Sequence, residues 1–252
     1  MPERPVLAMG EENDRCCLSD GEAGRLLAGS RWRRMVVLGD GKADRRAEQV
    51  NGYGSAPWPE RVADALREVD ALREVEPALA CLNLLSGRVR QAADVRSRQL
   101  PEALAFGGDL AVVQSAGHDL MRPGFDADAF GTELVRIISP LREGGYDVLL
   151  VDPFDLTRSP GARKLDDKVI QTRQGAQSKR SRTLAQRHGA LHLDLSAGRP
   201  TADAGVWGRA GMVLNSRGHA VMAAAVVRAL GEAIRRPAAG PGFRRTGESG
   251  AR

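Results

Sequence analysis

Short apolar runs alternate along this chain with segments of helical length. The apolar runs, each bounded by turn residues, lie at 35–38, 80–84, 110–115, 147–151 and 190–195. The segments expected to be helical lie at 88–105, 126–143, 164–188 and 216–232. Strands that alternate with helices of this length form a parallel sheet with helices on both faces. The sequence therefore predicts an α/β fold, a three-layer α/β/α sandwich around a five-stranded parallel sheet.

A further helix is expected to start near Pro59, a residue that suits a first helical turn. Val62 and Leu66 would lie on its apolar face. The pentapeptide ALREV occurs there at 65–69 and again at 71–75. A repeat after six residues turns a helix by about 600° and rotates its apolar stripe by roughly 240°. The helix must therefore either break or bury a new face.

The composition is that of an ordinary globular protein. Of the 252 residues, 42% are hydrophobic and 27% are charged. No apolar run is long enough for a membrane span, and the stretch MPERPVLAMGEENDR carries acids rather than an apolar core. We therefore expect a cytoplasmic protein that does not bind membranes. The three cysteines form no C-x-x-C pair, so neither a disulfide framework nor structural zinc is expected. We expect no metal and no cofactor.

The ends of the chain differ in composition from its middle. We expect a disordered segment at 1–16, one domain at 17–232 and a disordered basic tail at 233–252. A short helix capped by Asp20 would lie near the start of the domain. The C-terminal stretch RRPAAGPGFRRTGESGAR holds five arginines and one acid, which accounts for much of the net charge of +5. Because aromatic residues make up only 4% of the chain, we expect no nucleic-acid partner.

Ligands bind to parallel sheets of this kind at the carboxyl ends of the strands. Three predicted strand ends carry turn and polar residues here, namely 39–44, 83–88 and 116–120. The sequence therefore places its candidate site at these three ends.

These segments resemble the conserved blocks of the SGNH/GDSL hydrolases. Gly39-Asp40-Gly41 stands where that family has Gly-Asp-Ser, and LNLLSG at 82–87 is similar to its second block. AGHDL at 116–120 resembles the third block, Gly-Gly-Asn-Asp-Leu, and VWGRAGMVLNSRGHA at 206–220 resembles the last. CLSDGEAGRLLAGSRWRR is similar to the lead-in of actinobacterial members. The resemblance covers most of 17–232 and implies the flavodoxin-like fold of esterases and lipases.

The catalytic positions of that family are altered in this chain. By resemblance, its nucleophilic serine corresponds to Gly41, its histidine to Val213, its aspartate to Ala210 and its oxyanion asparagine to His118. His219 matches a different position, which is not catalytic in the family. Losing a serine–histidine unit costs on the order of 10⁶ in kcat in a serine hydrolase. We therefore expect a pseudoenzyme that binds a small ligand or a protein partner in the former cleft.

Some parts of the site would survive these changes. The resemblance implies that the backbone amides of Gly41 and Gly87 still form an oxyanion hole. Lys42 would bind an anion at the pocket mouth or be a solvated loop residue. Trp207 would wall the pocket or belong to the core.

One alternative is an enzyme of altered chemistry, in which His118 works with Asp119 or Asp40 as an acid/base pair. In the simpler interpretation, both carboxylates would only accept hydrogen bonds from loop amides. His118 would then only fill the space that the asparagine has in the family. Residual ester hydrolysis is a third possibility, although Ser86 and Ser115 are poor nucleophile candidates.

The remaining histidines do not complete a site. His188 is expected at a helix end and His192 at an alternating surface position, and Asp194 alone does not complete a metal site with them.

Overall fold

The computed structural model of this chain describes residues 10–43, 46–74, 78–85, 88, 91–114, 116–196, 204–209 and 211–235. Its strands there are β1 (Arg34–Gly39), β2 (Ala80–Asn83), β3 (Leu110–Gln114), β4 (Asp147–Val151) and β5 (Leu191–Leu193). Its longer helices are α1 (Glu22–Leu27), α2 (Trp58–Leu72), α4 (Leu100–Phe106), α6 (Ala127–Glu143), α7 (Asp167–Arg187) and α8 (Ser216–Arg235). Its short helical turns are η1 (Glu11–Asn13), α3 (Ala92–Asp94), η2 (Val95–Gln99), α5 (Gly117–Leu120), η3 (Leu156–Arg158), η4 (Pro160–Ala162) and η5 (Ala204–Val206).

The five strands form one parallel sheet in the order β2-β1-β3-β4-β5. The chain adds β2 on one side of β1 and then returns to place β3 on the other side. Such a switch in direction leaves a crevice at the carboxyl ends of the two neighbouring strands, where ligands bind in open α/β sheets. The strand order therefore places the candidate site at the carboxyl ends of β1 and β3.

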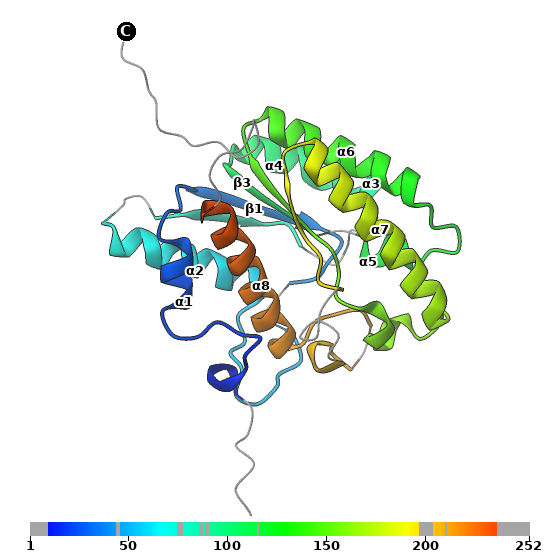
Figure 1. Cartoon of the computed structure of the whole chain (residues 1–252), viewed down its shortest axis with the longest axis horizontal. Helices are drawn as coiled ribbons and strands as arrows, with labels where there is room; N and C mark the ends of the chain where they lie inside the picture. Colours follow the sequence, from blue (N-terminus) through cyan, green and yellow to red (C-terminus); the bar gives the residue numbers. More distant parts are fainter. Residues whose placement is uncertain are drawn as a thin grey trace, which may run out of the picture.

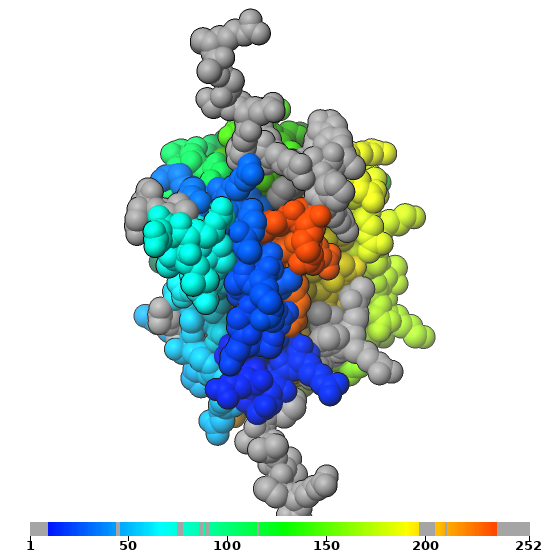
Figure 2. Space-filling view, turned by 60° about the vertical axis from the view of Figure 1, so that its left-hand side comes forward, coloured from blue at the N-terminus to red at the C-terminus, as the bar shows by residue number. Residues whose placement is uncertain are grey.

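Helices cover both faces of the sheet (Figure 1). Helices α1, α2 and α8 pack together on one face, whereas α4, α6 and α7 cover the other. In the turned view of Figure 2, α1 lies between α2 and α8 on the surface of the first layer. With both faces covered, all five residues of β4 are buried. Parallel strands read as continuous apolar runs for this reason.

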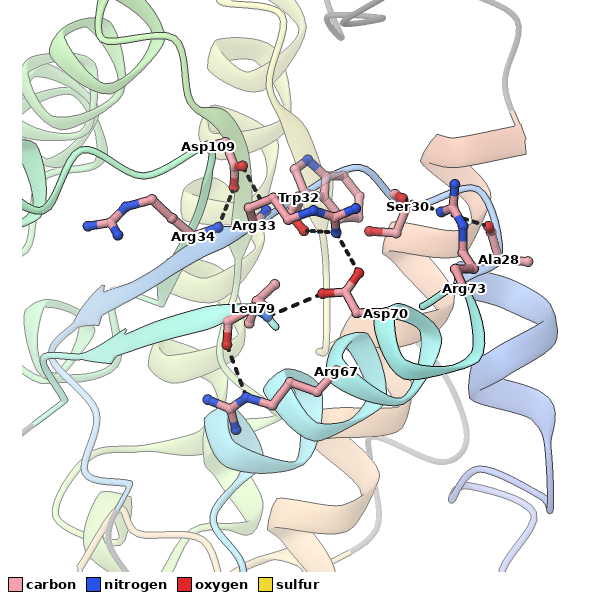
Figure 3. Close-up of polar contacts among 10 residues, drawn as sticks. All are labelled: Ala28, Ser30, Trp32, Arg33, Arg34, Arg67, Asp70, Arg73, Leu79 and Asp109. Carbon is pink, nitrogen blue, oxygen red and sulfur yellow. Dashed lines mark hydrogen bonds and ion pairs between the residues drawn. The ribbon is translucent and has the colours of Figure 1, made fainter. Parts of the chain in front are cut away.

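Polar contacts hold the amino-terminal ends of β1 and β2 against α2 (Figure 3). The carboxylate of Asp109 accepts hydrogen bonds from the backbone N–H groups of Arg33 and Arg34, at 2.7 and 2.9 Å. The buried carboxylate of Asp70 pairs with the Arg33 guanidinium and accepts the N–H of Leu79 at 3.2 Å. These contacts fix the strands at the end of the sheet opposite the candidate site.

The predicted three-layer sandwich is confirmed, and every predicted strand is present with ends that differ by at most two residues. Helix α2 ends at Leu72, inside the repeated ALREV segment, and Leu72 is 73% exposed. The helix therefore breaks rather than burying a second face. The expected helix at 88–105 is divided, because a π-helical turn, η2, separates α3 from α4.

The predicted cap at Asp20 is wrong. Gly21, with a φ of 65°, precedes α1, and no side chain caps the helix there. The Glu22 carboxylate instead accepts hydrogen bonds from the N–H and the hydroxyl of Ser19, at 2.9 and 3.1 Å. The contact between Ser19 and Glu22 therefore closes this turn.

The expected disordered segment 1–16 extends too far. Asp14 is 6% exposed, and its carboxylate accepts hydrogen bonds from Tyr53 and from the buried Arg217, each at 2.8 Å. This buried ion pair fastens residues 10–16 to α8. The expected tail also starts too early, since α8 continues to Arg235. Residues 1–9 and 236–252 lie outside the described part of the chain. No helix of the described part is long and apolar enough to cross a membrane.

Candidate functional site

The candidate site starts where β1 leaves the sheet at Gly39. Gly39 is the register partner of Gln114 at the end of β3, and the Asp40 N–H donates to the Gln114 carbonyl at 3.1 Å. A Cβ on Gly39 would lie 1.6 Å from that carbonyl oxygen. Only glycine therefore allows β1 and β3 to approach this closely before the chain turns into the Asp40-Gly41 loop.

The side-chain amide of Gln99 holds the end of β1 from the opposite side. Its Oε1 accepts the Gly39 N–H at 2.7 Å, and its Nε2 donates to the carbonyls of Gly39 and Leu84 at 3.0 and 2.9 Å. Gln99 comes from the π-helical turn η2 and is 5% exposed. It thus satisfies backbone groups at the point where β1 and β2 separate, and it fixes the loop that follows.

Asp40 and His118 meet across the ends of β1 and β3, as the sequence predicts. One carboxylate oxygen of Asp40 accepts the backbone N–H of His118 at 2.7 Å. The same oxygen lies 3.3 Å from Nδ1 of the His118 ring. The Asp40 side chain is 4% exposed, and that of His118 is 26% exposed. Asp40 therefore binds a loop amide and is also in reach of the imidazole.

Asp119, the next residue, binds a different segment of the chain. Its carboxylate accepts the N–H of Ala92 at 2.8 Å and is 7% exposed as a residue. Burial raises the pKa of the Asp119 carboxyl to about 6, and the charge of Asp40 adds to this effect. The Ala92 N–H, Arg122 and His118 act in the opposite direction. Asp119 thus anchors the start of α3 with a carboxyl that holds its proton more tightly than usual.

The end of the Gln114 side chain lies where a side chain at position 41 would begin. A Cβ on Gly41 would lie 2.7 Å from Oε1 of Gln114, and 3.1 Å from its Cδ. Both distances are too short for unstrained van der Waals contact. The Gln114 side chain therefore takes part of the space that a serine side chain at position 41 would enter.

A pocket that is partly open to solvent lies beside these residues. Its polar lining comes from Asp40, Lys42, Gln114 and His118. Its apolar walls are formed by aromatic and aliphatic side chains from several elements: Trp58, Phe154, Leu156, Trp207, Leu214 and Met222. Among the described residues that line it, none carries a hydroxyl or a thiol. The pocket suits an apolar body with a polar group at the Asp40 end.

Trp207 both walls the pocket and belongs to the core, the two roles that the sequence left open. It lines the pocket and is also 9% exposed. Its ring meets Phe154 edge-on, with centroids 6.2 Å apart. Its indole Nε1 is buried, with no hydrogen-bond partner in the described part of the chain. Lys42 also lines the pocket and is an exposed residue.

The segment 206–220, which resembles the family's last block, has valine at the position of the histidine. Val213, at the position of the histidine, is 37% exposed, and its carbonyl accepts the Gly208 N–H at 2.8 Å. His219 is buried in α8, where its Nδ1 accepts the Trp58 N–H at 3.4 Å. Ala210, Gly87, Ser86 and Ser115 lie outside the described residues.

His192 is not at the surface, so that prediction is wrong. Its side chain is 7% exposed, and its Nε2 lies 2.7 Å from the carboxylate of Asp152, which is also buried. Helix α7 covers this strand and supplies Gln177, which donates to the second oxygen of Asp152 at 2.6 Å. His188 follows the end of α7, as expected. In the described part of the chain, no group of His, Cys, Asp and Glu side chains could hold a metal ion.

The sequence does not identify two residues of the site, Gln114 and Ala116. Gln114 carries no motif, and its effect depends on the β1–β3 register. Ala116 has a φ of 93°, a conformation that favours glycine. The signal for Ala116 is present in the sequence, because AGHDL has alanine where the similar family block starts with glycine.

No family model and no curated protein matches this sequence. Solved structures do match it. A GDSL-like lipase from Parabacteroides merdae is 17% identical, with a TM-score of 0.63, and the match covers 79% of this chain and 95% of the lipase. A lipase/acylhydrolase from Enterococcus faecalis is 20% identical, with a TM-score of 0.57 and coverage of 80% and 96%.

An acetylxylan esterase from Geobacillus stearothermophilus is similar at 18% identity, with a TM-score of 0.54 and coverage of 79% and 94%. Structures of that esterase include catalytic mutants in which a serine or a histidine is changed to alanine. All of these proteins span the same three layers as the described domain.

Proposed function

We propose that this chain, whose fold is that of the SGNH/GDSL hydrolases, is a member of that family that binds a small ligand in the pocket and does not hydrolyse esters. The absence of a side chain at position 41, where the resemblance places the family's nucleophilic serine, carries this proposal. Acyl transfer needs a nucleophile beside a base that is itself oriented. Position 41 offers no side chain, and Gln114 occupies part of the space where one would stand.

The rest of the pocket supports the same conclusion. The similar acetylxylan esterase depends on a serine and a histidine, as its catalytic mutants indicate. Here Val213 stands at the position that the resemblance assigns to the histidine, and valine cannot accept a proton. No described residue that lines the pocket supplies another hydroxyl or thiol. The pocket itself is kept, with apolar walls and a polar end.

An acid/base enzyme is the second candidate, and the position of His118 favours it. Its Nδ1 lies 3.3 Å from the Asp40 carboxylate, which would orient the ring. The ring is partly exposed beside the pocket. Such a pair could transfer a proton to or from a bound molecule without any covalent intermediate.

Ester hydrolysis separates these candidates from an ordinary esterase. The purified protein would be incubated with a short-chain p-nitrophenyl ester and, separately, with a fluorophosphonate probe, beside its His118→Ala variant and a serine esterase. We expect that the probe labels neither the parent nor the His118→Ala variant. We also expect that neither form hydrolyses the ester above the buffer rate. Labelling of the parent would contradict the proposal. Turnover that disappears in His118→Ala would instead favour the acid/base enzyme. The cytoplasmic location and the absence of nucleic-acid and membrane partners stay predictions of the sequence.

A further inference from the structure

Two polar atoms of the pocket residues are buried without a partner. Gln114 Oε1 can accept a hydrogen bond and Trp207 Nε1 can donate one, yet neither is paired with any described group. Within the described residues, four buried side-chain atoms share this condition, and the other two are Ser30 Oγ and Arg180 Nε. An unpaired buried donor or acceptor costs about 1–3 kcal/mol. Half of these atoms therefore belong to one pocket, where a ligand could pair with them.

Both side chains are attached to backbone that the fold holds in place. Trp207 pairs with Leu214 in an isolated antiparallel bridge, and its carbonyl accepts the Asn215 side-chain amide at 2.9 Å. Gln114 is the last residue of β3 and pairs in register with Gly39. Because the backbone at both positions is already fixed, ligand binding would not have to order it.

The surroundings favour an uncharged ligand. The two charged side chains of the described lining residues, Asp40 and Lys42, have opposite signs, so their effects on a charged ligand oppose each other, and the buried Asp40 carboxylate and Gln114 Oε1 both act as acceptors. The apolar walls, including Trp58 and Met222, would leave either an anion or a cation poorly solvated. The polar group of the ligand must therefore be neutral and must both donate and accept.

We propose that the ligand of this pocket is a small uncharged molecule with a carboxamide group on an apolar body. Its N–H would donate to Gln114 Oε1 and its carbonyl would accept the Trp207 indole N–H. An ester offers acceptors only and could satisfy Trp207 but not Gln114. An amide is also complementary to both ends of the Gln114 side-chain amide. This inference rests on the proposed function, since it concerns a ligand that is bound and released unchanged.

Three probes of one shape test this chemistry: phenylacetamide, phenylacetate and methyl phenylacetate. Each would be titrated into the ¹⁵N-labelled protein while the indole N–H signals of its three tryptophans are followed. We expect phenylacetamide to bind in the millimolar range and to shift the Trp207 signal. One additional hydrogen bond makes its affinity roughly tenfold higher than that of methyl phenylacetate. Equal or tighter binding of phenylacetate or the ester, or no binding by any probe, would overturn the inference.

Variants identify the two atoms. Gln114→Met and Trp207→Phe keep much of the side-chain volume, and each should reduce amide binding roughly tenfold while leaving ester binding less affected. Ser30→Ala is the matched control, because it removes a buried unpaired atom that does not line the pocket. It should leave amide binding unchanged. An unchanged amide affinity in both pocket variants contradicts the inference, whereas hydrolysis of methyl phenylacetate by the parent would contradict the proposed function instead.

Discussion

Oε1 of Gln114 lies 2.7 Å from the point where a Cβ on Gly41 would stand. The end of the Gln114 side chain would therefore have to move if the loop that follows β1 carried a side chain at position 41. By the resemblance, position 41 in that loop is the position of the family's nucleophilic serine. Under the proposed function, the absence of a side chain at position 41 and the position of Gln114 are thus coupled, and a serine placed at position 41 alone would not rebuild a nucleophile.

Replacing Gly41 with serine tests this coupling. The added side chain would displace the flexible end of Gln114 and should destabilise the fold by about 1 kcal/mol, the lower end of the cost of overpacking. We expect Gly41→Ser to remain unlabelled by a fluorophosphonate probe, since no base is present at Val213. Urea denaturation measures the stability. The double variant Gly41→Ser with Gln114→Ala should recover most of it, and labelling of the single variant would refute the coupling.

Ala116 should be more stable as glycine. Its φ of 93° is unfavourable for a residue with a Cβ, and the residue is fully buried. Ala116→Gly removes that strain and should raise the free energy of unfolding by about 1 kcal/mol. The control is Ala103→Gly in α4, where the backbone is helical and the same change should cost about 1 kcal/mol. A loss of stability in both variants would show that Ala116 is not strained.

Asp119 should make stability fall as the pH rises. The pKa of its carboxyl is raised by burial from 3.8 to about 6, so the folded state keeps a proton that the unfolded state has already released. Between these two pH values the unfolded state binds fewer protons, and the free energy of unfolding decreases with pH. The contribution is on the order of 2–3 kcal/mol across the window.

The variant Asp119→Asn keeps an acceptor for the Ala92 N–H but cannot ionise. Its stability relative to the parent should therefore increase from pH 4 to pH 6 and stay constant above, as followed by urea denaturation. Glu22→Gln provides a control of opposite sign. A hydrogen bond from Arg228 lowers the pKa of Glu22 to about 2, so the contribution of Glu22 is present above its usual 4.5 and is lost as the pH falls toward 2. A difference between parent and Asp119→Asn that does not vary with pH would contradict the raised pKa.

Gln99 should be essential for the stability of the loop at Asp40. Gln99→Leu keeps the volume but leaves the Gly39 N–H, the Gly39 carbonyl and the Leu84 carbonyl without their side-chain partner. We expect a loss on the order of 3 kcal/mol in the free energy of unfolding. The exposed Gln171 in α7 offers a control, whose change to leucine should alter stability by no more than about 0.5 kcal/mol. Equal effects at both positions would show that the Gln99 contacts contribute little.

The sequence by itself determined the layers and the proximity of Asp40 and His118. Apolar runs alternating with helical segments require a parallel sheet covered on both faces, and the carboxyl ends of such strands meet at one edge. That reasoning brought Asp40 and His118 together, since they follow neighbouring strands. It also anticipated the problem of the repeated ALREV segment, because helical geometry is local. Each of these conclusions depends on residues close together in the chain or on the order of the strands.

Only the tertiary structure decided what surrounds Gly41 and which atoms face the pocket. Gln114 reaches Gly41 because β1 and β3 pair in one register, and a shift of one residue would turn Gln114 to the other face of the sheet. The buried pair of His192 and Asp152 arises because α7 covers an edge strand that an alternating pattern assigns to the surface. The walls from Phe154, Trp207 and Met222 come from three distant segments. Such contacts depend on side-chain packing through space, which no local pattern records.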